Sequence, residues 1–290
     1  MLLWRTPRVF RNYLMISQKV NRMNQTFNIH RFTLMLRFDV AEKGKTYLFT
    51  AALLLALLVL LMLPVGLSTQ YNNMKELLHI LALFMIVLFG TSLYTSSAFT
   101  QYAAPSTGIA AIMVPASRIE KFLSALLLNL VFIIPFVIIF WKLHYGTIAY
   151  ANAHLPAGGP KFNRIPEFVL QYAFQYYFLI HAFVFLGSLY FTKASYLKTA
   201  AIVIGSFLAI GLLHIGLGYY LTSFPSKLVA FPITGWSIWL YPDADAGRRV
   251  TEFYQVKLPE NVYTFIQLFP AWIVLVLWFA TYLRLREKEI

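Results

Sequence analysis

Six long apolar segments constrain this chain more than any other feature of its sequence. A helix needs roughly 20 apolar residues to cross ~30 Å of hydrocarbon. Segments suited to this are found at residues 47–67, 77–94, 122–143, 174–191, 199–221 and 262–283. The chain is 59% hydrophobic and 12% charged, which is more apolar surface than a soluble domain can bury. Because an open strand in lipid leaves backbone groups unpaired, the sequence predicts an all-α polytopic membrane protein with six transmembrane helices.

The distribution of Lys and Arg predicts which side each connection occupies. If the N-terminus lies inside, residues 1–46, 95–121, 192–198 and 284–290 face inward, and they carry most of the 24 basic residues. The expected layout is a basic cytoplasmic segment at 1–46 with an interfacial helix, a six-span domain at 47–283 and a short charged cytoplasmic tail at 284–290. The net charge of +13 then indicates contact with anionic lipid rather than nucleic acid.

The first 22 residues, "MLLWRTPRVFRNYLMISQKVNR", contain basic residues and no acid. They lack the continuous apolar core of a secretory signal peptide. They resemble a mitochondrial presequence slightly, being rich in Arg but poor in Ser. An alternative is that translation begins at Met23, so whether residues 1–22 belong to the mature protein stays open.

The next stretch, "NIHRFTLMLRFDVAEKGK", is predicted to form a helix at the membrane surface. Asn28 is the expected N-cap, and Arg37 is one of the basic residues expected at the lipid headgroups. An apolar stripe at helical spacing would face the lipid, formed by Ile29, Phe32, Leu36 and Val40. The alternative is an ordinary basic stretch beside the first span.

Several kinds of chemistry have no basis in the sequence. No acidic residue falls within the six segments, whereas ion-coupled carriers keep ionisable groups at membrane depth. The chain has no cysteine, no phosphate-binding loop of the G-x-x-x-x-G-K-[ST] type and no G-x-S-x-G motif. The chain is therefore not expected to be an enzyme or to bind a cofactor.

The histidines are interpreted as structural. His181 and His214 are each isolated on an apolar segment, where hydrogen bonding to a neighbouring helix is the expected role. His144 and His154 lie in a predicted outer loop with no acid between them, which disfavours zinc binding. No metal is expected.

Three features predict how the spans pack. Ala201, Gly205 and Ala209 recur every four residues, which gives the fifth span a thin face that another helix can approach closely. Pro135 is expected to kink the third span. In the last outer loop, Trp236, Trp239 and Tyr241 of "GWSIWLYP" predict either a short interfacial helix or a packed loop. All three residues lie outside the six predicted spans.

The connection between the second and third spans has the most specific pattern. Ser117 and Glu120 have the spacing of a capping box, so the next helix is expected to start at Arg118. Pro115 keeps the preceding segment separate from that helix. Between Pro105 and Pro115 lies "STGIAAIMV", which is long enough for a two-turn helix with Ser106 as a possible cap. A short apolar helix outside the bilayer is expected to dock on a soluble partner.

The stretch "GIAAIMVPASRIEKFLSALL", residues 108–127, resembles the membrane subunit of ABC-2-type exporters, and "PASRIEKFL" resembles ABC permeases of the Bacteroidetes type. The order G-x-x-x-x-x-x-P-[AV]-S-R before the third span and the plan of six spans carry the likeness. Many relatives have an acid where this chain has Ala110 and Ala111. The resemblance implies a coupling helix that contacts a separate cytoplasmic ATPase through Gly108, Ile109, Ile112, Met113, Pro115, Ser117, Arg118, Glu120 and Lys121.

By this resemblance, the chain is expected to be the permease subunit of an ABC exporter in the bacterial cytoplasmic (inner) membrane. Two membrane subunits, identical or different, would face each other across the path, and the ATPase would supply the missing nucleotide chemistry. The apolar, aromatic spans favour an amphipathic or lipidic cargo. The alternative is a membrane scaffold or sensor that transports nothing. A membrane-embedded enzyme would need a polar catalytic cluster near one leaflet, and the sequence offers none.

Overall fold

The computed structural model describes residues 26–102, 105–191, 193–221, 227–230, 238–241, 254–256 and 259–288. The predictions for residues 1–22, Met23 and Trp236 lie outside these ranges. The helices in chain order are α2 (Ile29–Gly66), α3 (Asn73–Met85), η1 (Ile86–Gly90, a π-helix), α4 (Thr91–Thr95), η2 (Thr100–Tyr102, a 3₁₀-helix), α5 (Pro105–Met113), α6 (Arg118–Phe132), α7 (Ile134–His154), α8 (Glu167–Tyr190), α9 (Ser195–Leu221) and α10 (Glu260–Lys288). The strands are β1 (Lys227–Ala230), β2 (Ile238–Tyr241) and β3 (Tyr254–Val256).

Among the described residues, six helical stretches are long and apolar enough to cross a membrane, and they correspond to the six predicted segments. The second stretch runs from α3 to η2, and the third joins α6 to α7. The prediction of an all-α polytopic membrane protein is confirmed. The described strands form one small sheet in the connection between α9 and α10.

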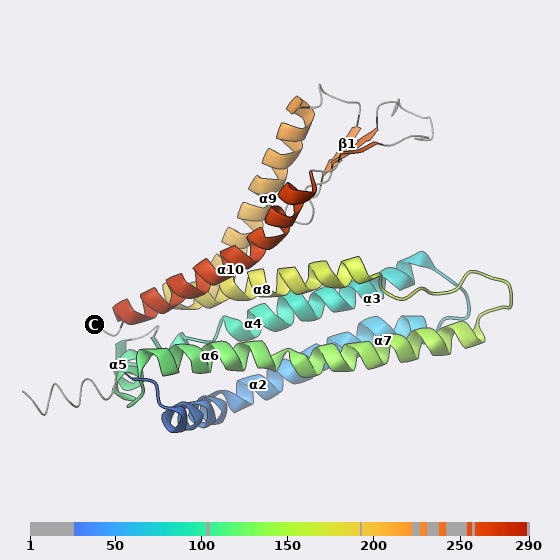
Figure 1. Ribbon diagram of the computed structural model, residues 1–290. Coiled ribbons are helices and arrows are strands. Elements are labelled where there is room, and N and C mark those ends of the chain that lie inside the picture. Colours follow the sequence, from blue (N-terminus) through green and yellow to red (C-terminus); the bar gives the residue numbers. More distant parts are fainter. Residues whose placement is uncertain are drawn as a thin grey trace, which may run out of the picture.

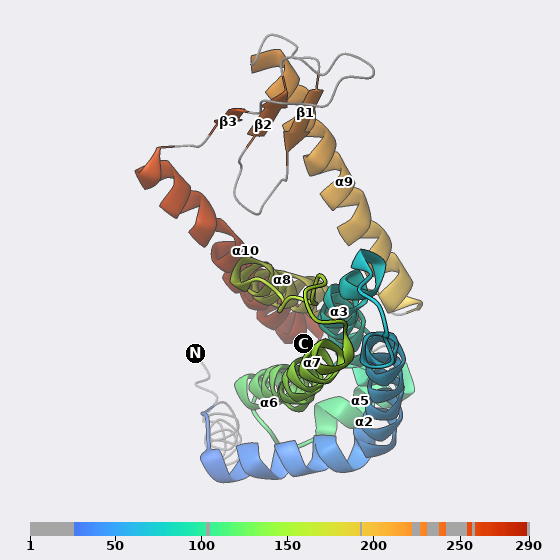
Figure 2. The same cartoon turned by 90° about the vertical axis from the view of Figure 1, so that its right-hand side faces the viewer.

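The first span is longer than predicted, because α2 is one helix of 38 residues that contains both the expected interfacial helix and the first span. Asn28 caps it as predicted, accepting hydrogen bonds from the backbone N–H groups of His30 and Arg31. The first part of α2 lies across one end of the other helices before the helix turns to run along them (Figure 2). That end also holds α5 and the end of α10, and is called the α5 end; the opposite end is called the far end (Figure 1).

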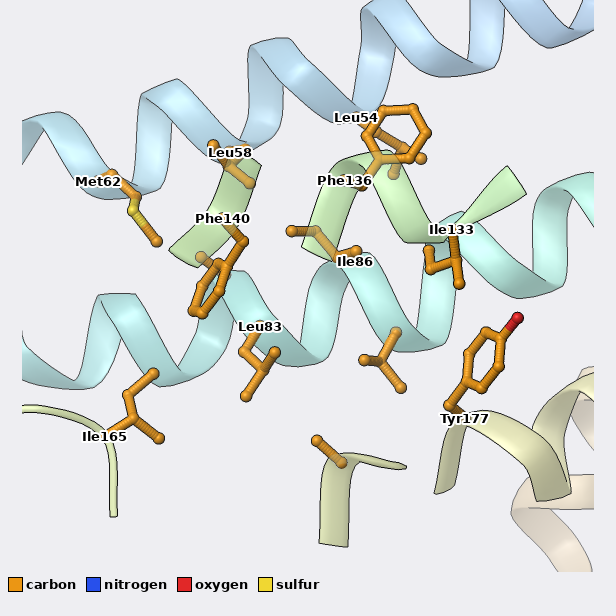
Figure 3. Close-up of a cluster of buried hydrophobic side chains, with 13 residues drawn as sticks. Leu54, Leu58, Met62, Leu83, Ile86, Ile133, Phe136, Phe140, Ile165 and Tyr177 are labelled. Atoms are coloured by element: carbon orange, nitrogen blue, oxygen red, sulfur yellow. The ribbon is translucent and has the colours of Figure 1, made fainter. Parts of the chain in front are cut away.

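The largest core cluster lies where α2, the second span and α7 meet (Figure 3). Leu54, Leu58 and Met62 recur every four residues, so they lie on one face of α2. Gly90 allows the second span to approach them, since a Cβ there would lie 2.9 Å from Leu54 Cδ1. Lipid is as apolar as these side chains, so close van der Waals packing, rather than escape from water, stabilises the contact.

The third span is interrupted as Pro135 predicts. α6 ends at Phe132, α7 begins at Ile134, and Pro135 occupies the first turn of α7. A proline there lacks the N–H that would continue the helical ladder, and its ring excludes the preceding turn. The two helices therefore form one candidate span with a break in it.

α9 and the first part of α10 diverge from the rest of the bundle and lead to the sheet (Figures 1 and 2). In the sheet, β2 pairs antiparallel with both β1 and β3, and Trp239 lies opposite Val229 and Gln255. The expected interfacial helix is therefore wrong for Trp239 and Tyr241, which lie in β2. β-Branched and aromatic residues in the sequence Ile-Trp-Leu-Tyr favour a strand once neighbouring strands pair with it.

Candidate functional site: the helix between the second and third spans

The predicted short helix is present as α5, which runs from Pro105 to Met113. It begins at Pro105 and not after Ser106, so the predicted cap is wrong. Proline suits the first helical position because its missing N–H would have no partner there. α5 ends two residues before Pro115, and α6 starts at Arg118, so the two helices are distinct, as predicted.

The predicted capping box at the start of α6 is confirmed. The Ser117 hydroxyl accepts a hydrogen bond from the Glu120 backbone N–H at 3.2 Å. In return, Glu120 Oε2 accepts from the Ser117 N–H at 2.7 Å. Both residues are buried, so this exchange fixes where the third span begins.

The other carboxylate oxygen of Glu120 reaches the start of α2. Glu120 Oε1 accepts from the Asn28 backbone N–H at 2.6 Å and from the Arg31 guanidinium at 3.0 Å. One fully buried carboxylate therefore joins the first turns of two helices that lie 92 residues apart in the chain. The sequence predicted only the local bond within the capping box.

Lys121 attaches α5 to α6. Its buried ammonium donates hydrogen bonds to the carbonyl oxygens of Ala111 at 2.9 Å and of Ile112 at 3.4 Å. Carbonyls in the last turn of a helix have no partner within that helix, and a positive charge there also suits the helix dipole. The end of α5 is thus held by the first turn of the third span.

Further polar contacts hold the first part of α2 against the bundle. Asp39 is buried, and its Oδ2 accepts a hydrogen bond from the Ser124 hydroxyl on α6 at 2.6 Å. Lys43 donates to the Ala98 carbonyl, just after α4, at 2.7 Å. The side of α2 that faces the bundle carries four residues at four-residue spacing, namely Arg31, Met35, Asp39 and Lys43.

This packing differs from the predicted apolar stripe. Ile29 is exposed, whereas Phe32 and Leu36 are half-buried. Leu34 and Phe38, on another side of the helix, are exposed as well. Arg37 is exposed, which is compatible with the expected headgroup contact. The face that packs on the protein is the charged one, and the role of this helix at the membrane surface stays a prediction.

The exposed part of α5 is apolar. Ile109, Ile112 and Met113 are 61%, 44% and 77% exposed, and Pro115 is exposed beside them. Ala111 points the other way, into a buried cluster that includes Phe99 and Leu285. A cleft of about 380 Å³, lined in part by Ala111, separates α5 from the first part of α2.

The structure divides the predicted partner contacts into two groups. The direct contact expected of Ser117, Glu120 and Lys121 is corrected, because these side chains are buried and bind other parts of this chain. Gly108 and Arg118 are partly exposed. The remaining predicted contacts form the exposed apolar surface, here called the α5 surface: Ile109, Ile112, Met113 and Pro115.

A second polar cluster lies at the far end and was not predicted. His79 on α3 and His144 on α7 are buried, with their Nδ1 atoms 2.8 Å apart. His144 Nε2 accepts a hydrogen bond from the Ile165 backbone N–H at 3.2 Å. The proton of His144 therefore sits on Nδ1 and is donated to His79, so both rings are neutral in this arrangement. Among the described residues, no group of His, Cys, Asp and Glu could hold a metal.

His181 has the interhelical bond predicted for it, since its Nδ1 accepts from the Trp278 indole on α10 at 3.3 Å. His214 is buried on α9. Within the described part of the chain, Ala201, Gly205 and Ala209 are all exposed, so the small-residue face of α9 has no helix packed on it there. The close approach occurs instead at Gly187, where a Cβ would lie 2.0 Å from the Thr199 hydroxyl.

The chain has no significant match among family models, curated proteins or solved structures. The resemblance to ABC-2-type exporters therefore rests on residues 108–127 and on the order of the spans.

Proposed function

We propose that this chain is the membrane subunit of an ATP-driven ABC-2-type exporter of the bacterial cytoplasmic membrane. In this role both termini lie in the cytoplasm and a separate ATPase binds the α5 surface. Two membrane subunits complete the transporter, and the cargo is amphipathic or lipidic. The chain itself performs no nucleotide chemistry.

One observation carries the proposal: α5 exposes apolar side chains while its carbonyls are fixed to the third span. The exposed side chains of Ile109, Ile112 and Met113 offer a partner three apolar anchors within two helical turns. The Lys121 bonds to the end of α5 make that helix and α6 move together. A displacement of the α5 surface by a partner would therefore be transmitted to the third span and would not be absorbed by a flexible linker.

The Glu120 contacts extend the same connection to the first span. Because one carboxylate binds the first turns of both α2 and α6, a displacement of α5 also shifts the start of α2. An ATPase that closes on hydrolysing or binding ATP could in this way move two spans together. A scaffold or sensor would have no need of ATP-dependent movement, which separates it from the exporter.

The docking role is tested by placing charges on the α5 surface. The protein is purified from its native membrane, bound proteins are identified by peptide mass spectrometry, and ATP hydrolysis is measured in the purified material. Wild type is expected to retain a protein with an ATP-binding domain. Ile112→Asp with Met113→Asp is expected to lose both that protein and the hydrolysis.

The matched control is Leu67→Asp with Met74→Asp, which adds the same charges at two positions of the far end that are each 70% exposed. This control is expected to retain the ATPase. Retention by the α5 double variant as well would refute the docking role. If the complex with the ATPase is placed in nanodiscs and no lipid or amphiphile changes its rate of ATP hydrolysis, the alternative function as a scaffold or sensor would be favoured.

Lys121→Met separates docking from transmission of movement. The variant keeps the apolar stem of the side chain but removes the donor that binds α5. The ATPase is expected to stay bound, while the change in hydrolysis rate caused by the membrane subunit is lost. An unchanged rate in this variant would mean that movement does not pass through the α5–α6 bonds.

A further inference from the structure

A large apolar cavity lies among the second span, α8, α9 and α10, away from the α5 surface. Its volume is about 640 Å³, within the ~300–1,000 Å³ typical of ligand sites. The lining contains no charged residue, and its residues with hydroxyl groups are Tyr176 and Ser206. Its apolar side chains include Leu88, Leu179, Phe183, Phe207 and Ile273.

The lining residues belong to four of the six candidate membrane-spanning stretches, including the diverging α9. Hydrocarbon is the medium around such helices, so an occupant that enters sideways meets no polar barrier. A water-filled cavity of this size would need polar partners for its water, and this lining provides few. The lining therefore suits an acyl chain.

The faces of α8 and α10 that line the cavity continue toward the α5 end, where the positively charged Arg284 lies on the same face of α10. Tyr190 lies seven residues after Phe183 on α8, and Arg284 lies eleven residues after Ile273 on α10. Both spacings return a residue to the same helix face. The two faces converge, since the Arg284 guanidinium lies 4.9 Å from the centre of the Tyr190 ring.

Arg284 has capacity for an anion. Its Nη1 donates to Glu287, whose side chain is 60% exposed and free to turn toward solvent. Among the described residues, Arg284 Nε is buried and has no hydrogen-bond partner. Guanidinium groups bind phosphate oxygens through paired N–H donors.

The separation fits one lipid leaflet. Eleven residues of helix place Arg284 ~16 Å from Ile273 along α10, about half of the ~30 Å hydrocarbon thickness. A lipid headgroup at Arg284 would therefore extend its chain to the cavity. Zwitterionic lipids carry a phosphate as well, but their positive group is repelled by the same arginine.

We propose that α8, α9 and α10 form a binding site for one anionic phospholipid of the leaflet at the α5 end, with its phosphate on Arg284 and an acyl chain in the cavity. The site goes beyond the proposed exporter role and does not depend on it. A second copy of the chain is the competing occupant, because the small-residue face of α9 is also exposed.

The binding of the lipid phosphate to Arg284 is tested by native mass spectrometry of the full chain in detergent with equal amounts of phosphatidylglycerol and phosphatidylcholine. Wild type is expected to retain phosphatidylglycerol preferentially. Arg284→Gln is expected to lower that retention about tenfold, as for one lost charge-assisted contact. Arg286→Gln removes the same charge from an exposed residue and is the matched control. Equal retention by the two variants would overturn the site.

The placement of the acyl chain is tested by filling the cavity with a larger side chain. Ile210→Trp adds volume to the lining, whereas Leu212→Trp adds it on an exposed face of the same helix. Only the first is expected to reduce phosphatidylglycerol retention, with both variants eluting as wild type in gel filtration. Retention by Ile210→Trp equal to that of Leu212→Trp would overturn the placement of the acyl chain.

The competing occupant is tested with cysteine, since the chain has none of its own. Ile204→Cys places a single thiol in the cavity lining. Under oxidation in phosphatidylglycerol nanodiscs it is expected to stay unlinked. A disulfide-linked pair would show that a second copy covers the cavity and would overturn the lipid site.

Discussion

The two ends of the helical bundle are held together by different chemistry. At the α5 end, buried charges make the long-range contacts: Glu120 binds the start of α2, and Asp39 binds Ser124. At the far end, the buried pair of His79 and His144 is neutral. The charged side chains of Glu76 and Lys75 also form hydrogen bonds there, but both are only half-buried.

The difference bears on how each end responds to force. Hydrogen bonds to charged groups contribute about 1.5–3 kcal/mol, against about 0.5–1.5 kcal/mol for neutral ones. The α5 end joins several helices through such bonds, so it is expected to move as one body. The far end mainly ties the loop before α8 to α3 and α7, through the Ile165 N–H and through Asn152, which bonds both backbone groups of Phe162.

The largest expected effect comes from removing the shared carboxylate. Glu120→Ala removes the acceptor of the Asn28 N–H and of one hydrogen bond of the Arg31 guanidinium, so the free energy of unfolding in mixed micelles is expected to fall by about 3 kcal/mol. Glu287→Ala removes an exposed carboxylate and is expected to change stability little. If both variants unfold alike, the α5 end is not held by buried charge.

The second effect tests the neutral cluster. His144→Ala removes the bonds to His79 and to the Ile165 N–H and leaves a cavity, which is expected to cost about 2 kcal/mol. His154→Ala is the control, because its exposed ring contacts only its own helix. Equal stability of the two variants would show that the histidine pair does not secure the far end.

A smaller effect is expected at the loop. Asn152→Ala removes the side-chain bonds to Phe162 and is expected to lower stability by about 1 kcal/mol. Its main result should be local: faster amide exchange at Phe162 than in wild type, with unchanged exchange at Ser117. Faster exchange at both positions would mean that the two ends are coupled, contrary to the comparison.

The smallest effect is a pH dependence at the surface of the far end. The Tyr71 hydroxyl donates to Glu76 at 2.7 Å, and this bond raises the pKa of Tyr71. The protonated tyrosine is therefore favoured in the folded state, and its contribution is present below pH ~10 and lost as pH rises further. Tyr71→Phe is expected to be slightly less stable than wild type at pH 8 and to approach the stability of wild type as pH rises above ~10. A difference that grows with pH would contradict this assignment.

The sequence predicted features that depend on neighbouring residues. The capping box needs only Ser117 and Glu120, three residues apart, and the spans need only a run of apolar residues. Pro135 and Asn28 likewise act within one helical turn. These predictions are confirmed because local geometry decides them.

The site could be predicted only in part, because its main contacts join distant residues. Nothing near Glu120 in the sequence indicates that Asn28 lies beside it, and the same holds for His79 and His144. Arg31, Met35, Asp39 and Lys43 do show helical spacing, but charged residues usually face water. Here the three charged residues face the protein, because each has a hydrogen-bond partner at the α5 end, namely Glu120, Ser124 or the Ala98 carbonyl.

The π-helix η1 sets the rotation of everything that follows it in the second span. A π-turn accommodates one residue more than an α-turn, and each residue turns an α-helix by about 100°. With that extra residue, Tyr94 stacks on Phe132 with ring centres 4.0 Å apart. Without it, the aromatic ring would rotate away from α6, and the chain would enter η2 and α5 facing another direction. The orientation of the α5 surface thus depends on a single residue placed in the middle of the second candidate span.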